Sequence, residues 1–266
     1  MSAEATSPPY EFSMGGVKCS THTIPQLLAE IQSLLAHRYD QPRSILCVNA
    51  HIYNVACNDA TLRDSLNNAR IVTADGMSIV WFSRLWNAFV PERCNMTEAF
   101  RAFLQCTTMR PSTAVLIGLT QAEAEHAAQR INAASKHCTV IKSYSGFLAE
   151  AEYAALFHSL GKVDFIFVGM STPRTERTCE LARRCCPDAI VWGIGAGTIR
   201  IYAGTMKEAS PFFRRHGLQW LHRLMNEPSK LWRRYLIGNP LFLYRAIKYS
   251  MFARRRSVTA PPAFRS

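Results

Sequence analysis

Six short apolar runs alternate along the chain with longer stretches of helical periodicity, and this alternation limits the possible folds more than any other feature. A short apolar run suits a strand that is buried on both faces. Strands that alternate with helices pair in parallel, with helices on both faces of the sheet. The sequence therefore predicts an α/β fold with a Rossmann-like, mostly parallel sheet and helices on both faces. The runs lie at 44–48, 69–74, 114–118, 138–144, 164–169 and 189–195.

The positive charge of the chain is concentrated towards its C-terminal end. The formal net charge is +12, and the stretch 205–256 contains twelve Lys or Arg residues but only two Glu residues. Such a surplus indicates an anionic partner, which can be nucleic acid, anionic lipid or a phosphorylated substrate. We predict a loose N-terminal segment (1–20), an α/β body (21–204), a basic amphipathic helical appendage (205–256) and a flexible tail (257–266).

The stretch 216–236 combines large apolar residues with cations, and Pro228 divides it into two helical patterns. The apolar faces hold Leu218, Trp220, Leu221, Leu224 and Met225, then Leu231, Trp232, Tyr235 and Leu236. The opposite faces hold Gln219, His222 and Arg223, then Lys230, Arg233 and Arg234. This pattern fits helices in a membrane interface, and also a helix pair that turns its cations towards a diphosphate. A plain helical hairpin with a solvated basic face has the same pattern.

Cysteine usage and the apolar pattern indicate a reducing compartment. The nine cysteines include no C-x-x-C pair, so neither a disulfide framework nor a zinc site is expected. The first twenty residues contain no apolar stretch of the signal-peptide kind. No window approaches the roughly 20 apolar residues of a membrane span. We therefore expect a protein of the cytoplasm or of a membrane surface that faces it.

Ligands of an open parallel sheet bind beyond the carboxyl ends of its strands. Asn49 and His51 follow the first apolar run, and Asp75 follows the second. A carboxylate in this position can accept a proton from an attacking hydroxyl. Asp75 also fits the N-cap of a helix over "GMSIVWF", and the local pattern alone favours the cap. His51 is interpreted as a packed histidine, and Arg93 suits either the surface or the same crevice.

The loops after the last two runs are candidates for binding an anion. "MSTPRTE" offers Thr172 as an N-cap and Pro173 as the first helical residue, so its helix-start amides can hold a phosphate, although an ordinary capped helix looks the same. "GIGAGT" at 193–198 permits close backbone approach but lacks the spacing of a dinucleotide-binding loop. With no D-x-D pair and no His/Cys cluster, we expect no metal and no cofactor, so that cations neutralise any leaving diphosphate.

Several stretches occur in an order that resembles one known family. They include "NAHIYNVACND", "ARIVTADGMSIVW", "DFIFVGMSTPRTE", "GIGAGTIRIYAG" and "GLQWLHRLMNEPSKLWRRYL". The T-A-D-G stretch followed by the last of these is the most specific combination. The chain thereby resembles the WecG/TagA/CpsF type of bacterial glycosyltransferase, which includes N-acetylmannosaminyltransferases. The resemblance covers nearly the whole chain after about residue 40.

The resemblance implies an inverting glycosyltransferase of bacterial surface polysaccharide or exopolysaccharide synthesis. Such an enzyme moves a hexose or an N-acetylhexosamine from a UDP-sugar to a polyprenyl-diphosphate-linked saccharide. The implied catalytic residues are Asp75, as general base, Asn49 and Arg93. The implied substrate-binding residues are Cys47, Thr73, Thr175, Glu176, Gly195, Arg223, Lys230 and Arg233.

The resemblance also implies where the protein works and with what. The expected partners of the protein are the UDP-sugar, the polyprenyl acceptor and an anionic membrane surface. Nucleic acid is not expected as a partner, and the question of a homo-oligomer is left open. The expected location is the cytoplasmic face of the bacterial inner membrane, where the protein would be peripheral. Four departures from the family pattern lie around the crevice and bear on the sugar more than on the reaction. Cys47 replaces Thr, Thr175 replaces Gln, Gln219 replaces Glu, and Glu98 replaces the Asp of a G-x-D triplet.

Three other classes of protein remain as alternatives. The basic C-terminal stretch suits a nucleic-acid-binding α/β protein, although the near-neutral body and the apolar helix faces argue against this class. The α/β pattern with its glycines suits a nucleotide-dependent oxidoreductase, which would require a nicotinamide. An inactive scaffold of the same fold is the third alternative.

Overall fold

The computed structural model describes residues 11–37, 42–86, 88–210, 212–213 and 216–259, without the side chains of Lys230 and of residues 252–259. Residues 1–10 of the expected loose segment (1–20) and residues 260–266 of the expected flexible tail (257–266) lie outside the described residues. The strands are β1 (Glu11–Met14), β2 (Val17–Ser20), β3 (Ser44–Val48), β4 (Ile71–Ala74), β5 (Ser112–Ile117), β6 (Cys138–Tyr144), β7 (Phe165–Val168) and β8 (Ile190–Gly193). The helices of the body are α1 (Ile24–Ala36), α2 (Ala50–Ala56), α3 (Ala60–Asn68), α4 (Met77–Leu85), α5 (Met96–Gln105), α6 (Gln121–Ala134), α7 (Glu150–Ser159), α8 (Arg174–Cys185) and α9 (Ala196–Tyr202). The later helices are α11 (Gln219–Asn226), α12 (Pro228–Trp232), the π-helix η1 (Arg233–Ile237) and α13 (Gly238–Thr259).

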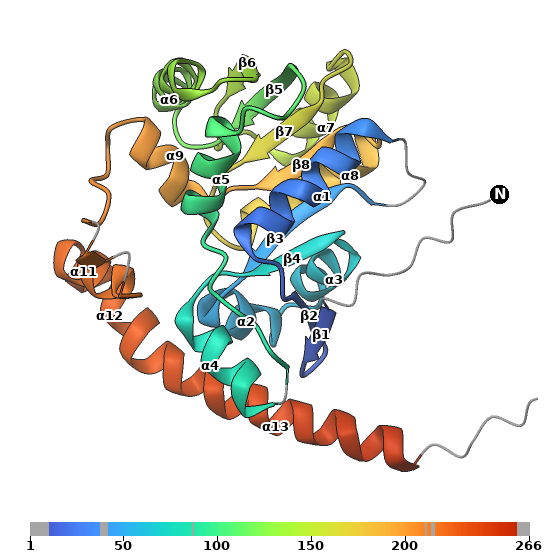
Figure 1. Cartoon of the computed structure of the whole chain (residues 1–266), viewed down its shortest axis with the longest axis vertical. Helices are drawn as coiled ribbons and strands as arrows, with labels where there is room; N and C mark the ends of the chain where they lie inside the picture. Colours follow the sequence, from blue (N-terminus) through green and yellow to red (C-terminus); the bar gives the residue numbers. More distant parts are fainter. Residues whose placement is uncertain (1–10, 38–41, 87, 211, 214–215, 260–266) are drawn as a thin grey trace, which may run out of the picture.

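The strands form one eight-stranded sheet in the order β1-β2-β4-β3-β8-β7-β5-β6, which crosses the middle of Figure 1. β1 and β2 pair antiparallel, and every other neighbouring pair is parallel. The six predicted runs correspond to β3 to β8, with ends that differ by a few residues at most. The predicted α/β fold is therefore confirmed.

Helices cover both faces of the sheet and enclose two hydrophobic cores. α1, α5, α6 and α9 pack on one face, and α2, α3, α4, α7 and α8 pack on the other. Alternate residues of a strand enter different cores: Phe165 and Phe167 of β7 enter the first, whereas Ile166 and Val168 enter the second. Because both faces of the central strands β3, β4, β7 and β8 are buried, these strands have nearly continuous apolar runs in the sequence.

β1 and β2 form a hairpin at one edge of the sheet, where the sequence leads us to expect a loose segment. Gly15 and Gly16 make the turn, with positive φ angles of 51° and 89°. Met14, Val17 and Cys19 are buried against the body. The hairpin is therefore held by its packing, and two four-residue strands are too short to give a clear period in the sequence.

The last helix of the C-terminal stretch packs on the body. α13 runs along α2 and also contacts α4 and β1, at the bottom of Figure 1. Phe242 and Ala246 of α13 are fully buried, and the Phe242 ring lies 5.1 Å from the ring of Tyr53 in an edge-to-face contact. Part of the predicted appendage therefore lies in the core of the body. The predicted division at residue 204 stays a prediction. Among the described residues, no helix combines the length and apolarity that crossing a membrane requires.

Candidate active site

A cleft of about 720 Å³ opens beyond the carboxyl ends of β3, β4, β7 and β8. Residues that follow these strands line one side of it, and residues of α11, α12, η1 and α13 line the other. This is the edge at which open α/β sheets bind ligands. The cleft is therefore assembled from parts of the chain that lie far apart in sequence.

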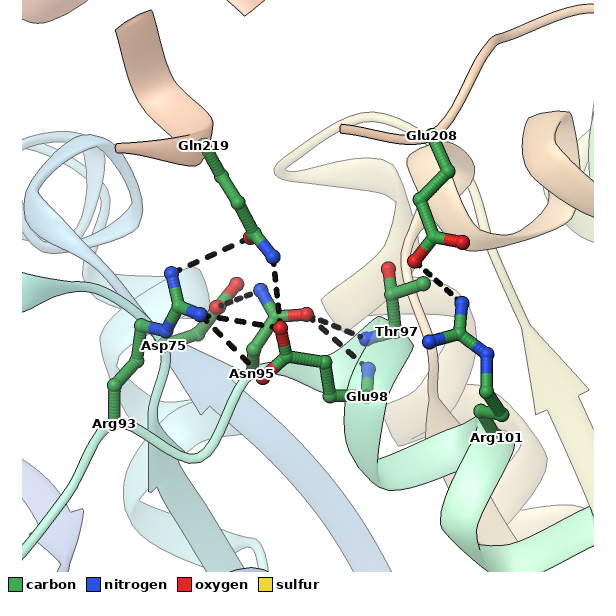
Figure 2. Close-up of polar contacts among 8 residues, drawn as sticks. All are labelled: Asp75, Arg93, Asn95, Thr97, Glu98, Arg101, Glu208 and Gln219. Atoms are coloured by element: carbon green, nitrogen blue, oxygen red, sulfur yellow. Dashed lines mark hydrogen bonds and ion pairs between the residues drawn. The ribbon is translucent and has the colours of Figure 1, made fainter. Parts of the chain in front are cut away.

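Asp75 lines this cleft directly after β4. Its backbone amide donates to the carbonyl of Val48 at 2.9 Å, which joins the ends of β3 and β4. Its Oδ1 accepts a hydrogen bond from Nδ2 of Asn95 at 2.9 Å, as Figure 2 shows. Helix α4 has Gly76 as its N-cap, with a φ of 147°, and has no side-chain cap. The interpretation of Asp75 as a helix cap is therefore wrong, and its carboxylate belongs to the cleft.

Asn49 and His51 line the same cleft after β3. Asn49 caps α2, because its Oδ1 accepts hydrogen bonds from the amides of His51 and Ile52, both at 3.0 Å. The cap fixes the orientation of the amide and directs its Nδ2 group away from the helix start. Burial, with a smaller contribution from the positive charge of Arg234, lowers the pKa of His51 to about 4. The imidazole of His51 is therefore neutral at pH 7.

Arg93 connects the start of α5 to α11 (Figure 2). Its Nη2 pairs with Oε1 of Glu98 at 3.3 Å, and its Nη1 donates to Oε1 of Gln219 at 3.3 Å. Nε2 of Gln219 donates to Oε1 of Glu98 at 2.8 Å and closes the triangle. The side chain of Arg93 is only 11% exposed and lines the cleft. Glu98 and Gln219, two of the departures from the family pattern, thus contact each other and hold Arg93.

Three more arginines line the cleft, and they are Arg200, Arg223 and Arg234. Arg200 of α9 forms an ion pair with Glu227 at 3.3 Å. Burial lowers the pKa of Arg234, whose electrostatic neighbours include Arg223 and Asp75. Arginine nevertheless keeps its charge in proteins, so the C-terminal helices bring fixed positive charge to the carboxylate of Asp75.

Arg233 and Lys230 complete the predicted cationic set, and the structure places Arg233 outside the cleft. Arg233 is exposed and does not line the cleft, and its Cζ lies 5.3 Å from the centre of the Trp232 ring. Lys230 lies in α12, but its side chain is outside the described part of the chain. Arg234 occupies the cleft wall that was predicted for Arg233.

The helix faces predicted after Pro228 are wrong. Leu231, Arg234 and Tyr235 line the cleft together, whereas Trp232 and Leu236 are 42% and 58% exposed. The cleft lies at the boundary between the two predicted faces, because Arg234 and Tyr235 lie three and four residues after Leu231 and so share its side of the helix. Residues 233–237 form a π-helix.

The loop after β7 brings two buried side chains of α8 to the cleft. Oγ1 of Thr175 donates to the carbonyl of Met170 at 2.7 Å and accepts from its amide at 2.9 Å. Glu176 is only 3% exposed, and burial raises its pKa. Its Oε1 accepts from Oγ1 of Thr172 at 3.0 Å, and its buried Oε2 has no hydrogen-bond partner among the described residues. Thr172 thus contacts Glu176 and is not the predicted cap, because Pro173 occupies the N-cap position without a side-chain bond.

The remaining predicted residues divide between the cleft and the sheet. Cys47 lines the cleft, and burial, with the negative charge of Asp75, raises the pKa of its thiol well above the usual value. Gly195 lines the cleft in the loop after β8, with a φ of 78° that favours glycine. Thr73 is fully buried in β4, where its Oγ1 donates to the carbonyl of Leu46 at 3.5 Å. The structure therefore places Thr73 outside the cleft.

Three residues of the cleft are missed by reasoning from the sequence. Asn95 precedes the helical stretch "MTEAF", and this N-cap signal places it at the start of α5. Arg200 lies one helical turn after Ala196, the first residue of the helix that follows β8. Arg234 lies three residues after Leu231, so helical spacing puts both on one side of the helix, but the sequence does not show that this side lines the cleft.

Comparison with known proteins decides the family. A model of the Glycosyl transferase WecG/TagA/CpsF family matches residues 12–256. The chain belongs to this family. The resemblance found in the sequence is thereby confirmed, and the chain is a glycosyltransferase.

Similar members of the WecG/TagA/CpsF family include proteins of Staphylococcus aureus strains MW2 and NCTC 8325 / PS 47. Both are named N-acetylglucosaminyldiphosphoundecaprenol N-acetyl-beta-D-mannosaminyltransferase. Each is 23% identical to this chain over 248 residues, which are 93% of this chain and 96% of the relative. The similarity therefore extends over both the sheet and the C-terminal helices.

Proposed function

We propose that this chain transfers a hexose or an N-acetylhexosamine from a UDP-sugar to a saccharide linked to polyprenyl diphosphate. The names of the Staphylococcus aureus relatives support this class of acceptor and make N-acetylmannosamine the first sugar to test. The product would serve the synthesis of a bacterial surface polysaccharide or exopolysaccharide.

In the proposed step, an acceptor hydroxyl attacks the anomeric carbon of the donor, and its oxygen forms the new glycosidic bond. The bond between that carbon and the β-phosphate oxygen breaks, and UDP leaves with the bonding electron pair. The proton of the hydroxyl passes to the carboxylate of Asp75, which acts as a general base. A single displacement of this kind inverts the configuration at the anomeric carbon.

The observation that carries this proposal is the position of the Asp75 carboxylate in a cleft lined by guanidinium groups. Arg93, Arg223 and Arg234 line the same cleft. Arginine pairs well with phosphate through parallel hydrogen bonds. Burial favours the neutral form of Glu176, the other carboxyl group beside Cys47. The arrangement thus suits one proton acceptor next to a diphosphate leaving group.

The exposed apolar side chains around the cleft support a lipid-linked acceptor and a membrane surface. Trp81, Leu85 and Leu243 line the cleft and are 57%, 67% and 39% exposed. Leu236 and Ile237 add exposed apolar area on η1. Burial of such area in a bilayer interface is favourable by about 25 cal/mol per Å², and anionic lipid attracts basic residues. We place the protein on the cytoplasmic face of the bacterial inner membrane, with the polyprenyl chain left in the bilayer.

Calorimetry with UDP and a screen of UDP-sugars test the proposal. The full chain should bind UDP, and it should transfer one sugar to a short-chain polyprenyl-diphosphate N-acetylglucosamine, seen as the mass increase of one sugar. Turnover in EDTA tests the expectation that arginines, without a divalent metal, neutralise the leaving group. Failure to bind UDP and to form any product would contradict the proposal. A product formed only when the donor sugar carries a nucleotide other than UDP would contradict the proposed UDP-sugar and leave the rest of the proposal intact.

A further inference from the structure

Asn95 uses both ends of its side-chain amide. Its Oδ1 accepts hydrogen bonds from the amides of Thr97 and Glu98, at 3.1 Å and 3.2 Å, and so caps α5. Its Nδ2 donates to Oδ1 of Asp75 at 2.9 Å, as Figure 2 shows. Because the cap can only use the oxygen, it fixes the orientation of the amide and directs the NH₂ group to the carboxylate.

We infer that Asn95 is a positioning residue for sugar transfer, which holds the Asp75 carboxylate by Oδ1 and leaves Oδ2 to take the proton of the acceptor hydroxyl. The inference rests on the proposed function, in which Asp75 is the base. Asn95 itself touches no reacting atom in this scheme. It acts through the direction in which it holds the carboxylate.

Apart from Asn95, the local structure around Asp75 does not fix the orientation of its carboxylate. Helix α4 starts at Gly76 without a side-chain cap, so the side chain of Asp75 is not held by the helix that follows it. Asn95 comes from 20 residues further along the chain. It is carried by α5, whose Phe100 and Phe103 are fully buried in the core. The donor is thus mounted on a rigid element, as a precise catalytic geometry requires.

Charged and titratable groups from other elements also act on this carboxylate. Arg234 of η1 attracts it, and Cys47 of β3 and Cys94 before α5 interact with it electrostatically. Arg93 lines the same cleft. Without the amide of Asn95, the carboxylate is free to turn towards Arg234, where it would pair with a cation and lose its alignment with the acceptor. The hydrogen bond to Asn95 therefore determines the orientation of the carboxylate towards the acceptor hydroxyl.

Two substitutions that retain the cap test this role. Serine and aspartate both cap helices well, so Asn95→Ser and Asn95→Asp should keep α5 and melt close to the wild-type temperature. Asn95→Ser removes only the donor, and we expect kcat to fall on the order of ten- to a hundredfold while KM for the UDP-sugar changes little. Asn95→Asp adds a second carboxylate beside Asp75, which disfavours ionisation of the pair. Its acid limb of kcat against pH should therefore move to higher pH, further than in Asn95→Ser.

Replacing a merely structural cap by another good cap would change neither kcat nor the pH profile, so Asn95→Ser is the variant that makes the test specific. Thr23→Ser is the matched control, because it changes the N-cap of α1 to the same residue outside the cleft. Wild-type kcat and an unmoved acid limb in both Asn95 variants would overturn the inference. Wild-type turnover in Asp75→Asn would instead overturn the proposed base, so the two failures can be told apart.

Discussion

Arg223 lies so close to Gly197 that a Cβ atom on Gly197 would stand 2.5 Å from Nη2 of Arg223. The guanidinium is the far end of a flexible side chain, so Gly197→Ala should displace Arg223 and leave the fold intact. We expect turnover to fall by about ten- to a hundredfold, because a hydrogen bond to a charged group contributes roughly 1.5–3 kcal/mol. Gly161→Ala is the control, since a Cβ there meets nothing within 4 Å. Equal turnover in both variants would argue against a role for the position of Arg223.

Asp75→Asn should abolish most of the transfer without loss of UDP binding. The amide is nearly the size of the carboxylate but cannot take a proton, and a positioned general base contributes about 10² to 10⁴ in rate. Turnover and calorimetry with UDP measure the two effects separately. Asp64→Asn, on the exposed side of α3, controls for the loss of one negative charge. If Asp75→Asn turned over like Asp64→Asn, another group would have to be the base.

His51 should make the protein less stable in mild acid. Below about pH 6.5 the unfolded histidine takes up a proton, whereas the lowered pKa of about 4 keeps folded His51 neutral. Stability is therefore lost as pH falls from 6.5 towards 4. His51→Gln should remove this loss, which we put at about 1 kcal/mol at pH 5.5 after allowance for partial exposure. Urea unfolding at pH 5.5 and pH 8 measures it, with the exposed His126→Gln as control.

Glu176 should have the opposite dependence on pH. Burial raises its pKa in the folded state, so the folded carboxyl resists ionisation where the unfolded one has already ionised. The stability of the wild type is thus lost as pH rises from the unfolded pKa through the folded value. Glu176→Gln stays neutral throughout, and it should raise the melting temperature by a few degrees at pH 8 but not at pH 4. A gain of equal size at both pH values, or in the exposed Glu150→Gln, would contradict this explanation.

The exposed apolar side chains beside the cleft should bind the protein to anionic vesicles. Trp81 and Phe89 are 57% and 70% exposed, on α4 and just after it. Changing both to Ser should weaken co-sedimentation with vesicles that contain anionic phospholipid by about tenfold or more, since apolar burial is lost. High salt should weaken binding of the wild type as well, because it screens the basic residues.

The matched control for vesicle binding is Ile141→Ser. Ile141 is 50% exposed on β6, at the sheet edge opposite to β1, so its loss should not change binding. Vesicle binding that is equally weak in both variants would contradict a binding surface beside the cleft. A wild-type chain that ignores anionic vesicles at low salt would contradict the membrane proposal altogether.

The parts of the fold that can be predicted from the sequence are those that form because of residues close together in the chain. β3 has the predicted ends at 44–48, because a strand that is buried on both faces leaves an apolar run in the sequence. β6 has the predicted ends at 138–144 as well, although it is an edge strand whose first residues alternate between buried and exposed. The hairpin of β1 and β2 has no such run. Its residues become buried because α13 contacts β1, while α3 and β4 contact β2. The formation of the hairpin therefore depends on contacts with distant parts of the chain.

The candidate site divides in the same way. Asn49 and Asp75 follow strands, so the strand order alone locates them at the ligand-binding edge. The local pattern favours Asp75 as a helix cap, and the structure excludes this cap, because Gly76 is the N-cap of α4 and the carboxylate accepts a hydrogen bond from Asn95. The role of Asp75 as a base stays a proposal. The family resemblance implied Thr73 as a substrate-binding residue, although its side chain is buried in the sheet.

The sequence by itself determined the order of strands and helices, and with it the edge of the sheet at which Asn49 and Asp75 emerge. Apolar runs and their periodicity are local properties of the sequence, so they can be identified from neighbouring residues. Only the tertiary structure decided which distant groups meet at that edge: Asn95 on Asp75, and Arg234 in place of Arg233 on the cleft wall. These contacts depend on how helices far apart in the chain pack together, and this packing does not follow from the spacing of adjacent residues.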